Sequence, residues 1–220
     1  MLAQHRKQQS FLFLITLFFA SLVMAVEEPK YSVLEQSGEF ELRYYAPLIL
    51  AQVEVAGDLD SASSQGFRLI AAYIFGKNQV NDKISMTAPV TMESRNDFAS
   101  QKIAMTAPVT IEANNPKDKG IGNDRWFISF VMPSEYTLST LPKPLDSEVQ
   151  IRELPAEKKA VITFSGFYNQ DKILEKTKAL EVWIKSRQMQ AIGEPQFARY
   201  NPPWTLPFMR RNEIMIQVRD

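Results

Sequence analysis

The residue types that enzymes use most often for nucleophilic and metal chemistry are nearly missing from this chain. Its 220 residues include no cysteine and one histidine, His5, which lies close to the N-terminus. If the segment that carries His5 is removed, as argued next, the protein contains neither imidazole nor thiol. This excludes disulfides, cysteine nucleophiles, Ser-His-Asp triads and the usual zinc sites. A hydrolase would have to rely on a buried Glu or on a Ser-Lys pair.

The first 25 residues have the three-part pattern of a secretory signal peptide. Arg6 and Lys7 form a basic start, an apolar run of about 15 residues follows, and Val23 and Ala25 occupy positions −3 and −1 of a cleavage site. The alternative is an uncleaved membrane anchor. A spanning helix needs about 20 apolar residues, whereas this run stops before Glu27. We therefore expect cleavage after Ala25 and export of the rest of the chain.

The charge balance bears on possible partners. The whole chain carries 25 Lys and Arg against 25 Asp and Glu, so the protein without its first 25 residues stays close to neutral. A near-neutral chain lacks the basic surface that nucleic-acid binding requires, and a chain without cysteine cannot be lipid-anchored through an N-terminal Cys. We expect no nucleic-acid partner and no stable membrane span after cleavage. The location would be the periplasm if the source is a Gram-negative bacterium.

The most distinctive pattern is a phrase that occurs twice, as KISMTAPVTME over residues 83–93 and as KIAMTAPVTIE over residues 102–112. In each copy the side chains alternate as in a strand, with one face formed by Ile84, Met86 and Ala88 in the first copy and by Ile103, Met105 and Ala107 in the second. Proline cannot donate to a sheet ladder, so each copy should bend at its proline. We predict two neighbouring antiparallel strands joined by a polar loop over residues 93–101.

The flanking segments predict two similar sets of elements. In the first half, period-2 alternation favours strands over residues 39–44 and 49–55. A polar stretch over residues 58–64 then precedes a helix, since Phe67, Ile70, Ala71 and Ile74 recur at helical spacing. The repeated phrase, a polar loop over residues 114–124 and a buried strand over residues 126–132 complete this half.

The second half follows the same order. Residues 149–167 contain two strands around a Pro-Ala-Glu turn, and residues 171–187 form a helix with one apolar face, made by Ile173, Thr177, Leu180 and Ile184. A short strand over residues 193–200, a loop over residues 201–207 and a strand over residues 212–219 follow. The sequence therefore predicts an α+β fold made of two pseudo-symmetric ββαββ repeats, over about residues 30–133 and 148–219.

Three segments together resemble the SOUL haem-binding protein family: NQVNDKISMTAPV over residues 78–90, QKIAMTAPVT over residues 101–110 and YNPPWTLPFMRRNEI over residues 200–214. The resemblance covers roughly residues 30–219 and implies one domain over residues 26–220. It also implies a distorted antiparallel β-barrel or sheet flanked by two helices. The implied function is binding of haem or a related tetrapyrrole in a shallow apolar cleft, without catalysis.

In this family the cleft lies between the first helix and the loop before the last strand. The matching segments here imply apolar walls formed by Phe67, Ile70, Ala71, Ile74, Phe75, Trp204, Leu206, Phe208 and Met209. They imply cations for the haem propionates at Arg68, Lys77 and Arg210. Without histidine, an axial ligand would have to come from Tyr73, Tyr200 or Met209. Two alternatives stay open: each apolar residue could belong to the core, and Arg210 and Arg211 could cap the last strand or pair with Glu213.

The sequence thus favours an exported, non-catalytic carrier or buffer of haem or another tetrapyrrole. The main alternative is a binding module for another hydrophobic or amphipathic small molecule, because the two-repeat architecture also resembles the effector-binding domains of some bacterial regulators. A hydrolase is the third reading. In the first two cases the partner is a small hydrophobic ligand.

Overall fold

The computed structural model describes residues 26–80, 100–114 and 125–220. Several predictions lie outside these ranges: the signal peptide over residues 1–25, the strand in the first copy of the repeated phrase, and most of the polar loops over residues 93–101 and 114–124.

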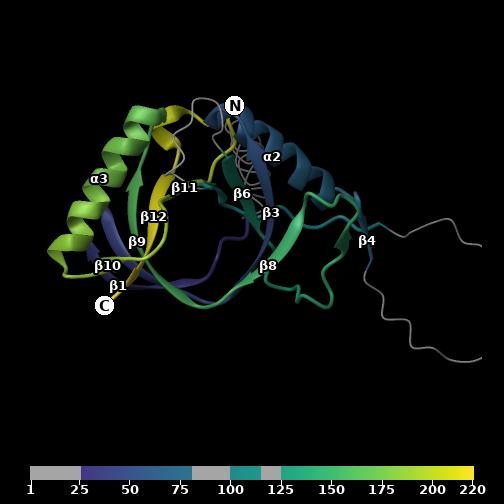
Figure 1. Ribbon diagram of the computed structural model, residues 1–220, viewed down its shortest axis with the longest axis horizontal. Coiled ribbons are helices and arrows are strands. Elements are labelled where there is room, and N and C mark those ends of the chain that lie inside the picture. The colour runs from purple at the N-terminus through teal and green to yellow at the C-terminus, as the bar shows by residue number, and fades with distance from the viewer. Residues whose placement is uncertain (1–25, 81–99, 115–124) are drawn as a thin grey trace, which may run out of the picture.

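The described residues form one strongly curled antiparallel sheet with two helices outside it (Figure 1). Its strands follow the order β1-β2-β9-β12-β11-β5-β6-β3-β8, and β10 pairs with β12. In chain order the elements are β1 (Tyr31–Ser37), β2 (Phe40–Tyr45), β3 (Leu48–Ala56), α2 (Leu59–Ile74), β4 (Asn78–Gln79), β5 (Val109–Ala113), β6 (Arg125–Val131), β7 (Lys143–Pro144), β8 (Gln150–Leu154), β9 (Glu157–Phe164), α3 (Gln170–Ser186), β10 (Gln190–Ala191), β11 (Gln196–Arg199), the 3₁₀ helix η1 (Pro207–Met209) and β12 (Asn212–Arg219). The short strands β4 and β7 pair with each other outside the main sheet.

Two halves of the sheet are related by pseudo-symmetry. The first half contains β2, β3, α2, β5 and β6, and the second contains β8, β9, α3, β11 and β12 in the same order. The ladder order reads β8-β3-β6-β5 in one direction and β2-β9-β12-β11 in the other, so equivalent strands occupy equivalent places. The predicted α+β fold of two ββαββ repeats with two outer helices is confirmed.

The two halves are joined near both ends of the strand order and in its middle. Ala46 and Pro47 connect β2 to β3, and Pro155 and Ala156 connect β8 to β9. Along these two segments β2 pairs with β9, and β3 pairs with β8. The bends coincide, since Tyr45 faces Glu157 and Leu48 faces Leu154. At the other junction β5 pairs with β11. Every strand pair at these junctions contains one strand from each half.

The apolar core lies between the outer face of the sheet and the helices. From α2, Ile70 and Ile74 are completely buried, and from α3 Leu180 and Ile184 are buried in the same cluster. The packing is close at Gly66, where an added Cβ would lie 2.4 Å from Cγ1 of Ile128 on β6. The core predicted from helical periodicity is therefore confirmed at these positions.

The beginning of α2 lies earlier than the sequence suggested. The polar stretch before Phe67 forms the first turns of the helix, which starts at Leu59. Asp58 caps it, because its carboxylate accepts hydrogen bonds from the backbone N–H groups of Asp60 and Ser61 at 3.1 and 2.9 Å. Ser and Asp are common at caps and poor inside helices, which is why composition alone placed the boundary too late.

The second copy of the repeated phrase differs from its predicted strand. Residues 101–105 have no regular secondary structure, and β5 begins only at Val109, after a cis peptide bond between Ala107 and Pro108. The alternation fails as well, since Thr106 and Ala107 are both buried while Met105 is exposed. The Thr106 hydroxyl bonds to the carbonyl of Val131, which holds this segment by a side chain instead of a ladder. The predicted pairing of the two copies is also wrong for β5, because β6 and β11 occupy both of its sides.

Candidate functional site

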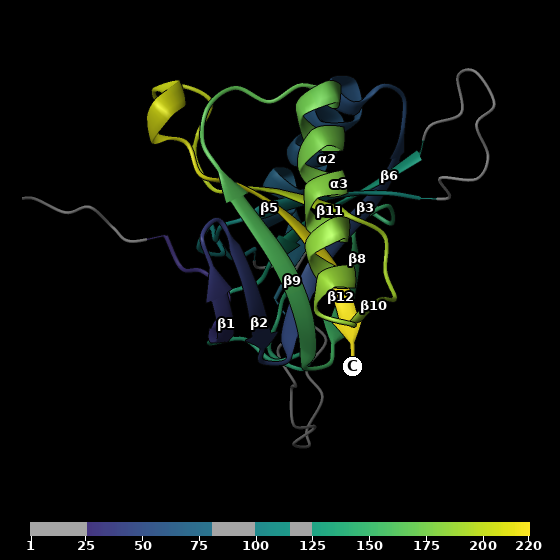
Figure 2. The same ribbon diagram turned by 90° about the vertical axis from the view of Figure 1, so that its left-hand side faces the viewer.

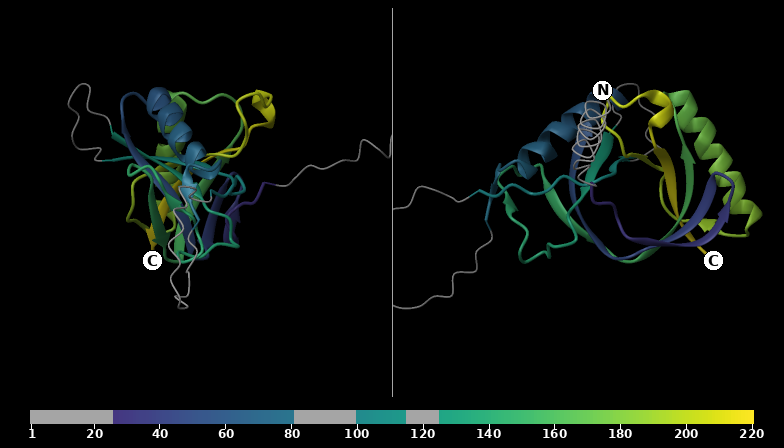
Figure 3. Two further views of the ribbon diagram at one scale, coloured as in Figure 1. Left: turned by 90° about the vertical axis from the view of Figure 1, so that its right-hand side faces the viewer. Right: turned by 180° about the vertical axis from the view of Figure 1, so that it is seen from behind.

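The connection between β11 and β12 forms an apolar projection on the surface. Figure 2 shows η1 standing away from both helices, and the left view of Figure 3 shows the same projection from the opposite side. The large side chains here are unusually open to solvent: Trp204 is 82% exposed, Phe208 73%, Met209 62% and Leu206 55%. Phe167, from the β9–α3 connection, is 72% exposed. The two connections touch, since the N–H of Gly166 donates to the carbonyl of Pro207 at 2.9 Å. We call these five exposed side chains the apolar projection.

Cations lie beside the apolar projection. A broad, shallow depression of about 660 Å³ contains Lys172 and Lys176 from α3, Arg210 and Arg211 from the connection, and one carboxylate, Glu39. Three of these cations already have carboxylate partners: Lys172 pairs with Glu175, Lys176 with Glu39, and Arg211 with Glu28 and Glu213.

Arg210 is the cation in the depression that has no carboxylate within 4 Å in the described part of the chain. Its guanidinium donates to the carbonyl oxygens of Thr205 at 2.8 Å and Pro203 at 2.5 Å, and it lies 5.2 Å from the ring centroid of Phe167. Arg210 thus fixes the backbone of the β11–β12 connection by hydrogen bonds. Its positive charge lies next to the apolar projection without a carboxylate partner.

The structure divides the residues that were predicted on the first helix. Ile74 and Ala71 face the core, whereas Phe67 is 38% exposed and Arg68 is exposed. Phe75, exposed at the C-terminal end of α2, lies about 18 Å along the helix axis from Ser63, the residue at which α2 contacts Arg199 of β11. The exposed Lys77 follows two residues later. Lys77 instead accepts a backbone hydrogen bond from Leu145. Phe75 and Lys77 are therefore not brought together with Trp204, Leu206, Phe208, Met209 and Arg210.

The three candidate axial ligands differ in their access to solvent. Tyr73 is 1% exposed and its hydroxyl donates to the carbonyl of Pro142 at 2.7 Å. The Tyr200 hydroxyl donates to Glu213 at 2.7 Å. Burial raises the pKa of both phenols, which disfavours the tyrosinate form that iron prefers. Met209 has an open side chain on the apolar projection, so it is the candidate of the three that a surface ligand could reach.

Sequence reasoning missed Phe167, Lys172 and Lys176. The spacing of the two lysines, four apart at the start of a helix, places them on one face, and this signal was available. Nothing in the sequence indicated that the two lysines lie near the β11–β12 connection, because this depends on its contact with the β9–α3 connection.

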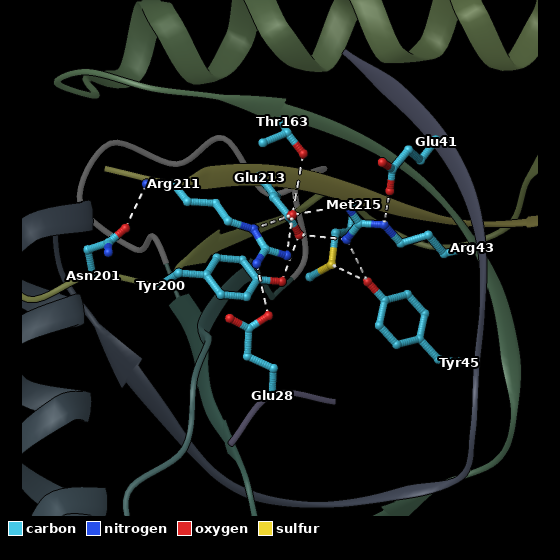
Figure 4. Close-up of polar contacts among 10 residues, drawn as sticks. All are labelled: Glu28, Glu41, Arg43, Tyr45, Thr163, Tyr200, Asn201, Arg211, Glu213 and Met215. Atoms are coloured by element: carbon cyan, nitrogen blue, oxygen red, sulfur yellow. Dashed lines mark hydrogen bonds and ion pairs between the residues drawn. The ribbon is translucent and has the colours of Figure 1, made fainter. Parts of the chain in front are cut away.

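The base of the projection is fixed by a buried charge network on the inner face of the sheet (Figure 4). Glu213 is fully buried and accepts hydrogen bonds from Arg43 at 3.0 and 3.1 Å, from Arg211 at 2.9 Å and from Tyr200 at 2.7 Å. Burial alone would raise the pKa of Glu213, but the hydrogen bonds and charge of Arg43, with the charge of Arg211, outweigh it and hold this pKa below its usual range. Of the alternatives left open for the two arginines, pairing with Glu213 therefore holds for Arg211, whereas Arg210 donates to backbone carbonyls. A carboxylate so fully bonded acts as scaffold.

A second groove, of about 460 Å³, lies between the N-terminal segment, the β2–β3 bend and the segment after β6. Much of its lining is apolar, for example Pro47, Ile49 and Met132. Its charged lining is mainly acidic, with Glu27, Glu28 and Glu153 against Lys30. An anionic ligand would meet repulsion here, so this groove fits a porphyrin dicarboxylate less well than the apolar projection does.

Comparison with known proteins identifies the family. Residues 26–98 and 92–217 match the SOUL heme-binding protein family. The chain belongs to this family. The resemblance that was seen in the repeated phrase and the tail is thereby confirmed.

Relatives of this SOUL protein include human Heme-binding protein 2, which is 30% identical over 199 residues, covering 87% of this chain and 86% of the human protein. Mouse Heme-binding protein 2 is 28% identical with the same coverage. Among solved structures, the EcmrR C-terminal domain is similar with a TM-score of 0.56 at 11% identity, covering 86% of this chain and 98% of that domain. At this identity the likeness concerns the fold alone. Neither helix in the described ranges has the length and apolar character to cross a bilayer.

Proposed function

We propose that this protein binds haem or a related tetrapyrrole on the apolar projection and acts as a carrier or buffer without catalysis. The observation that carries the proposal is an apolar surface of two aromatic connections beside a depression with four cations and one carboxylate. A porphyrin has the matching chemistry, a flat apolar face and two propionates. The names of the human and mouse relatives support the same ligand.

The residues present fit such a ligand in distinct roles. Trp204, Phe208 and Phe167 offer aromatic surface for the porphyrin face. Arg210 offers a cation without a carboxylate partner, and Lys172 lies in the same depression. Exposed ion pairs contribute only about 0–1 kcal/mol, whereas burial of apolar surface contributes about 25 cal/mol per Å². The aromatic contacts should therefore supply most of the affinity, and Met209, the accessible one of the three candidate ligands, would be the side chain able to reach the iron.

A hemin titration followed by the Soret band tests this placement. The wild-type protein should bind with saturation at 1:1 stoichiometry, and Trp204→Glu should abolish binding because it places a carboxylate on the apolar face. Phe75→Glu is the matched control, since it introduces the same charge at an exposed aromatic residue at the far end of α2. Arg210→Ala should weaken binding only modestly.

Two results would contradict the proposal. Binding that survives Trp204→Glu but is lost in Phe75→Glu would place the ligand on α2. A wild-type protein that shows no saturation at micromolar hemin would favour a different hydrophobic or amphipathic ligand.

We also propose that the protein is exported, with cleavage after Ala25. The support is the N-terminal pattern, together with the way the chain joins the fold directly afterwards: Glu27 bridges to Thr106 and accepts a hydrogen bond from the N–H of Ser134 at 3.0 Å. Intact-mass measurement of the exported fraction should show a chain that lacks its first 25 residues. Recovery of the full 25.1 kDa chain from that fraction would contradict this.

A further inference from the structure

The inner face of the curled sheet is polar, in contrast to its outer face. Figure 1 and the right view of Figure 3 look down the curl and show both helices packed on the outside of the sheet. Side chains that point inward include Gln52, Ser129 and Lys159, all less than 10% exposed. Small barrels are usually filled by apolar side chains, and burial of a polar group is costly unless it is bonded. Here these buried polar groups bond to one another and to neighbouring side chains, Gln52 with Ser129 and Lys159 with Glu157 and Gln196.

A cavity of about 210 Å³ lies on this inner face and is lined by residues of β2, β3, β5, β6, β8, β9, β11 and β12. At about 30 Å³ per water molecule it matches roughly seven waters. This is smaller than the 300–1,000 Å³ typical of sites for drug-sized ligands. The cavity therefore suits a molecule of the size of an amino acid, and it is far too small for a porphyrin.

Part of the cavity lining consists of side chains linked by hydrogen bonds, and the last of them is the carboxylate of Glu112. Lys159 pairs with Glu157 at 2.9 Å and donates to the side-chain oxygen of Gln196 at 2.9 Å. The amide nitrogen of Gln196 in turn donates to Glu112 at 2.8 Å. Within the described ranges no cation lies within 4 Å of Glu112, so its direct partner is a neutral amide, while Lys159 and Arg152 act on it only from a greater distance. Burial raises the pKa of this carboxyl, as expected for a carboxylate without a cationic partner.

Another part of the lining carries a cation, the exposed residue Arg152. Arg152 of β8 donates one hydrogen bond to the side-chain oxygen of Gln52 at 2.7 Å, and Gln52 donates to Ser129 at 3.0 Å. No carboxylate of the described residues lies within 4 Å of Arg152, so its other N–H groups face no acidic partner. Arg152 and Glu112 line the same cavity and influence each other electrostatically without forming an ion pair. Leu50, Phe127 and Met215 provide apolar surface next to them.

We propose that this inner cavity binds a small zwitterion, a molecule of amino-acid size with an ammonium group, a carboxylate and an apolar part. The ammonium would pair with Glu112, the carboxylate would form charge-assisted hydrogen bonds with Arg152, and the apolar part would contact Leu50 and Met215. A carboxylate and a guanidinium that line one cavity without pairing with each other are complementary to such a ligand and to neither a simple cation nor a simple anion.

The ligand side is tested by titrating isotope-labelled protein with L-methionine, L-leucine and 5-aminopentanoate and following amide chemical shifts. L-Methionine should bind with saturation, with Kd of about 1 mM or tighter, and the other two zwitterions show how binding depends on ligand shape. N-acetyl-L-methionine lacks the ammonium and L-methionine methyl ester lacks the carboxylate. Each should bind about tenfold more weakly than free methionine, because one charged partner remains unpaired. Equal binding of free and blocked methionine, or no saturation by L-methionine, would overturn the proposal.

The two proposed charged partners are tested with the variants Glu112→Gln and Arg152→Gln. In Glu112→Gln, free and N-acetylated methionine should bind equally weakly, and in Arg152→Gln free methionine and its methyl ester should do so. Each variant should therefore lose the difference in affinity between free methionine and one blocked form only. A variant with a damaged fold would instead lose binding of all forms alike. Glu153→Gln is the control, because Glu153 is next to Arg152 on the strand and points to the other face, and it should leave binding unchanged. If the control loses binding as much as the test variants do, the assignment fails.

The inner cavity does not depend on the proposed haem surface. Trp204→Glu should leave zwitterion binding unchanged, and Glu112→Gln should leave hemin binding unchanged, so either proposal can fail without the other.

Discussion

At the scale of single residues, Glu213 is a charge that burial would penalise severely if its partners were missing. Its carboxylate accepts bonds from Arg43, Arg211, Tyr200 and Thr163. Glu213→Gln would leave the buried Arg43 without this partner, so we expect a loss of about 3–5 kcal/mol in the free energy of unfolding, measured by urea denaturation. Glu54→Gln, in the exposed pair with Arg125, should cost about 0–1 kcal/mol. Similar losses in both variants would contradict a special role for Glu213.

Two carboxyl groups on the inner face should respond to pH in opposite directions. The folded state lowers the pKa of Glu213, so its stabilising effect is complete above the unfolded-state pKa and is lost as the pH falls through the folded-state pKa. Burial raises the pKa of Glu112, so its ionised form destabilises the fold at neutral pH, and this cost disappears on acidification.

Replacing each carboxyl by an amide separates the two effects. Glu112→Gln should be more stable than wild type at neutral pH and should converge with it in acid. Glu213→Gln should be less stable at neutral pH, with the deficit shrinking in acid. Thermal unfolding at several values between about pH 3 and pH 8 checks both. A Glu112→Gln variant that is less stable than wild type at neutral pH would show that its carboxylate is well compensated in the unliganded fold.

At the scale of elements, α2 is held to the sheet by a narrow apolar face. Ile74 is completely buried, whereas the next residue, Phe75, is 58% exposed. Ile74→Ala should therefore lower the free energy of unfolding by about 2–5 kcal/mol, from lost burial and a residual cavity. Phe75→Ala should have little effect, which denaturant titration of both variants would show. A loss below about 0.5 kcal/mol for Ile74→Ala would mean that the buried face is assigned wrongly.

Local pattern sufficed for elements whose side chains alternate against a single core. The strands β2 and β3 followed from period 2, and the apolar faces of both helices followed from period 3.6. The repeated phrase misled because Thr106 is held by its side chain and Pro108 cannot join a ladder. That phrase alternates like a strand, yet its segment before Val109 packs by contacts that lie far away in sequence.

The candidate site was harder to predict than the fold. The family resemblance of residues 200–214 pointed to Trp204, Phe208, Met209 and Arg210 from sequence. The position of Phe167 beside them depends on how the β9–α3 and β11–β12 connections meet. The pairing of Glu112 with Gln196 likewise depends on strand register between the two halves. Residue types can be listed from a sequence, whereas facing positions across a curled sheet require its topology.

At the scale of the whole molecule, the pseudo-symmetric halves are bound into one sheet. Each junction pairs a strand of one half with a strand of the other, β2 with β9, β3 with β8 and β5 with β11. The inner cavity is also shared, since Glu112 comes from the first half and Arg152 from the second. Neither half could complete its strand pairing or the cavity without the other.

This mutual dependence predicts that the two halves unfold together, and tryptophan positions allow a direct test. Trp126 reports on β6 in the first half, Trp183 on α3 in the second, and Trp204 on the projecting connection. Replacing Trp204 and either of the others by Phe leaves one reporter in one half. In each variant the denaturation midpoint from tryptophan fluorescence should coincide with the midpoint from far-ultraviolet circular dichroism, as a two-state transition requires. Comparing the two probes within one variant cancels any change in stability caused by the substitutions. Separate midpoints, with one half losing its fluorescence signal before the bulk of the sheet unfolds, would show that the junction strands do not couple the repeats.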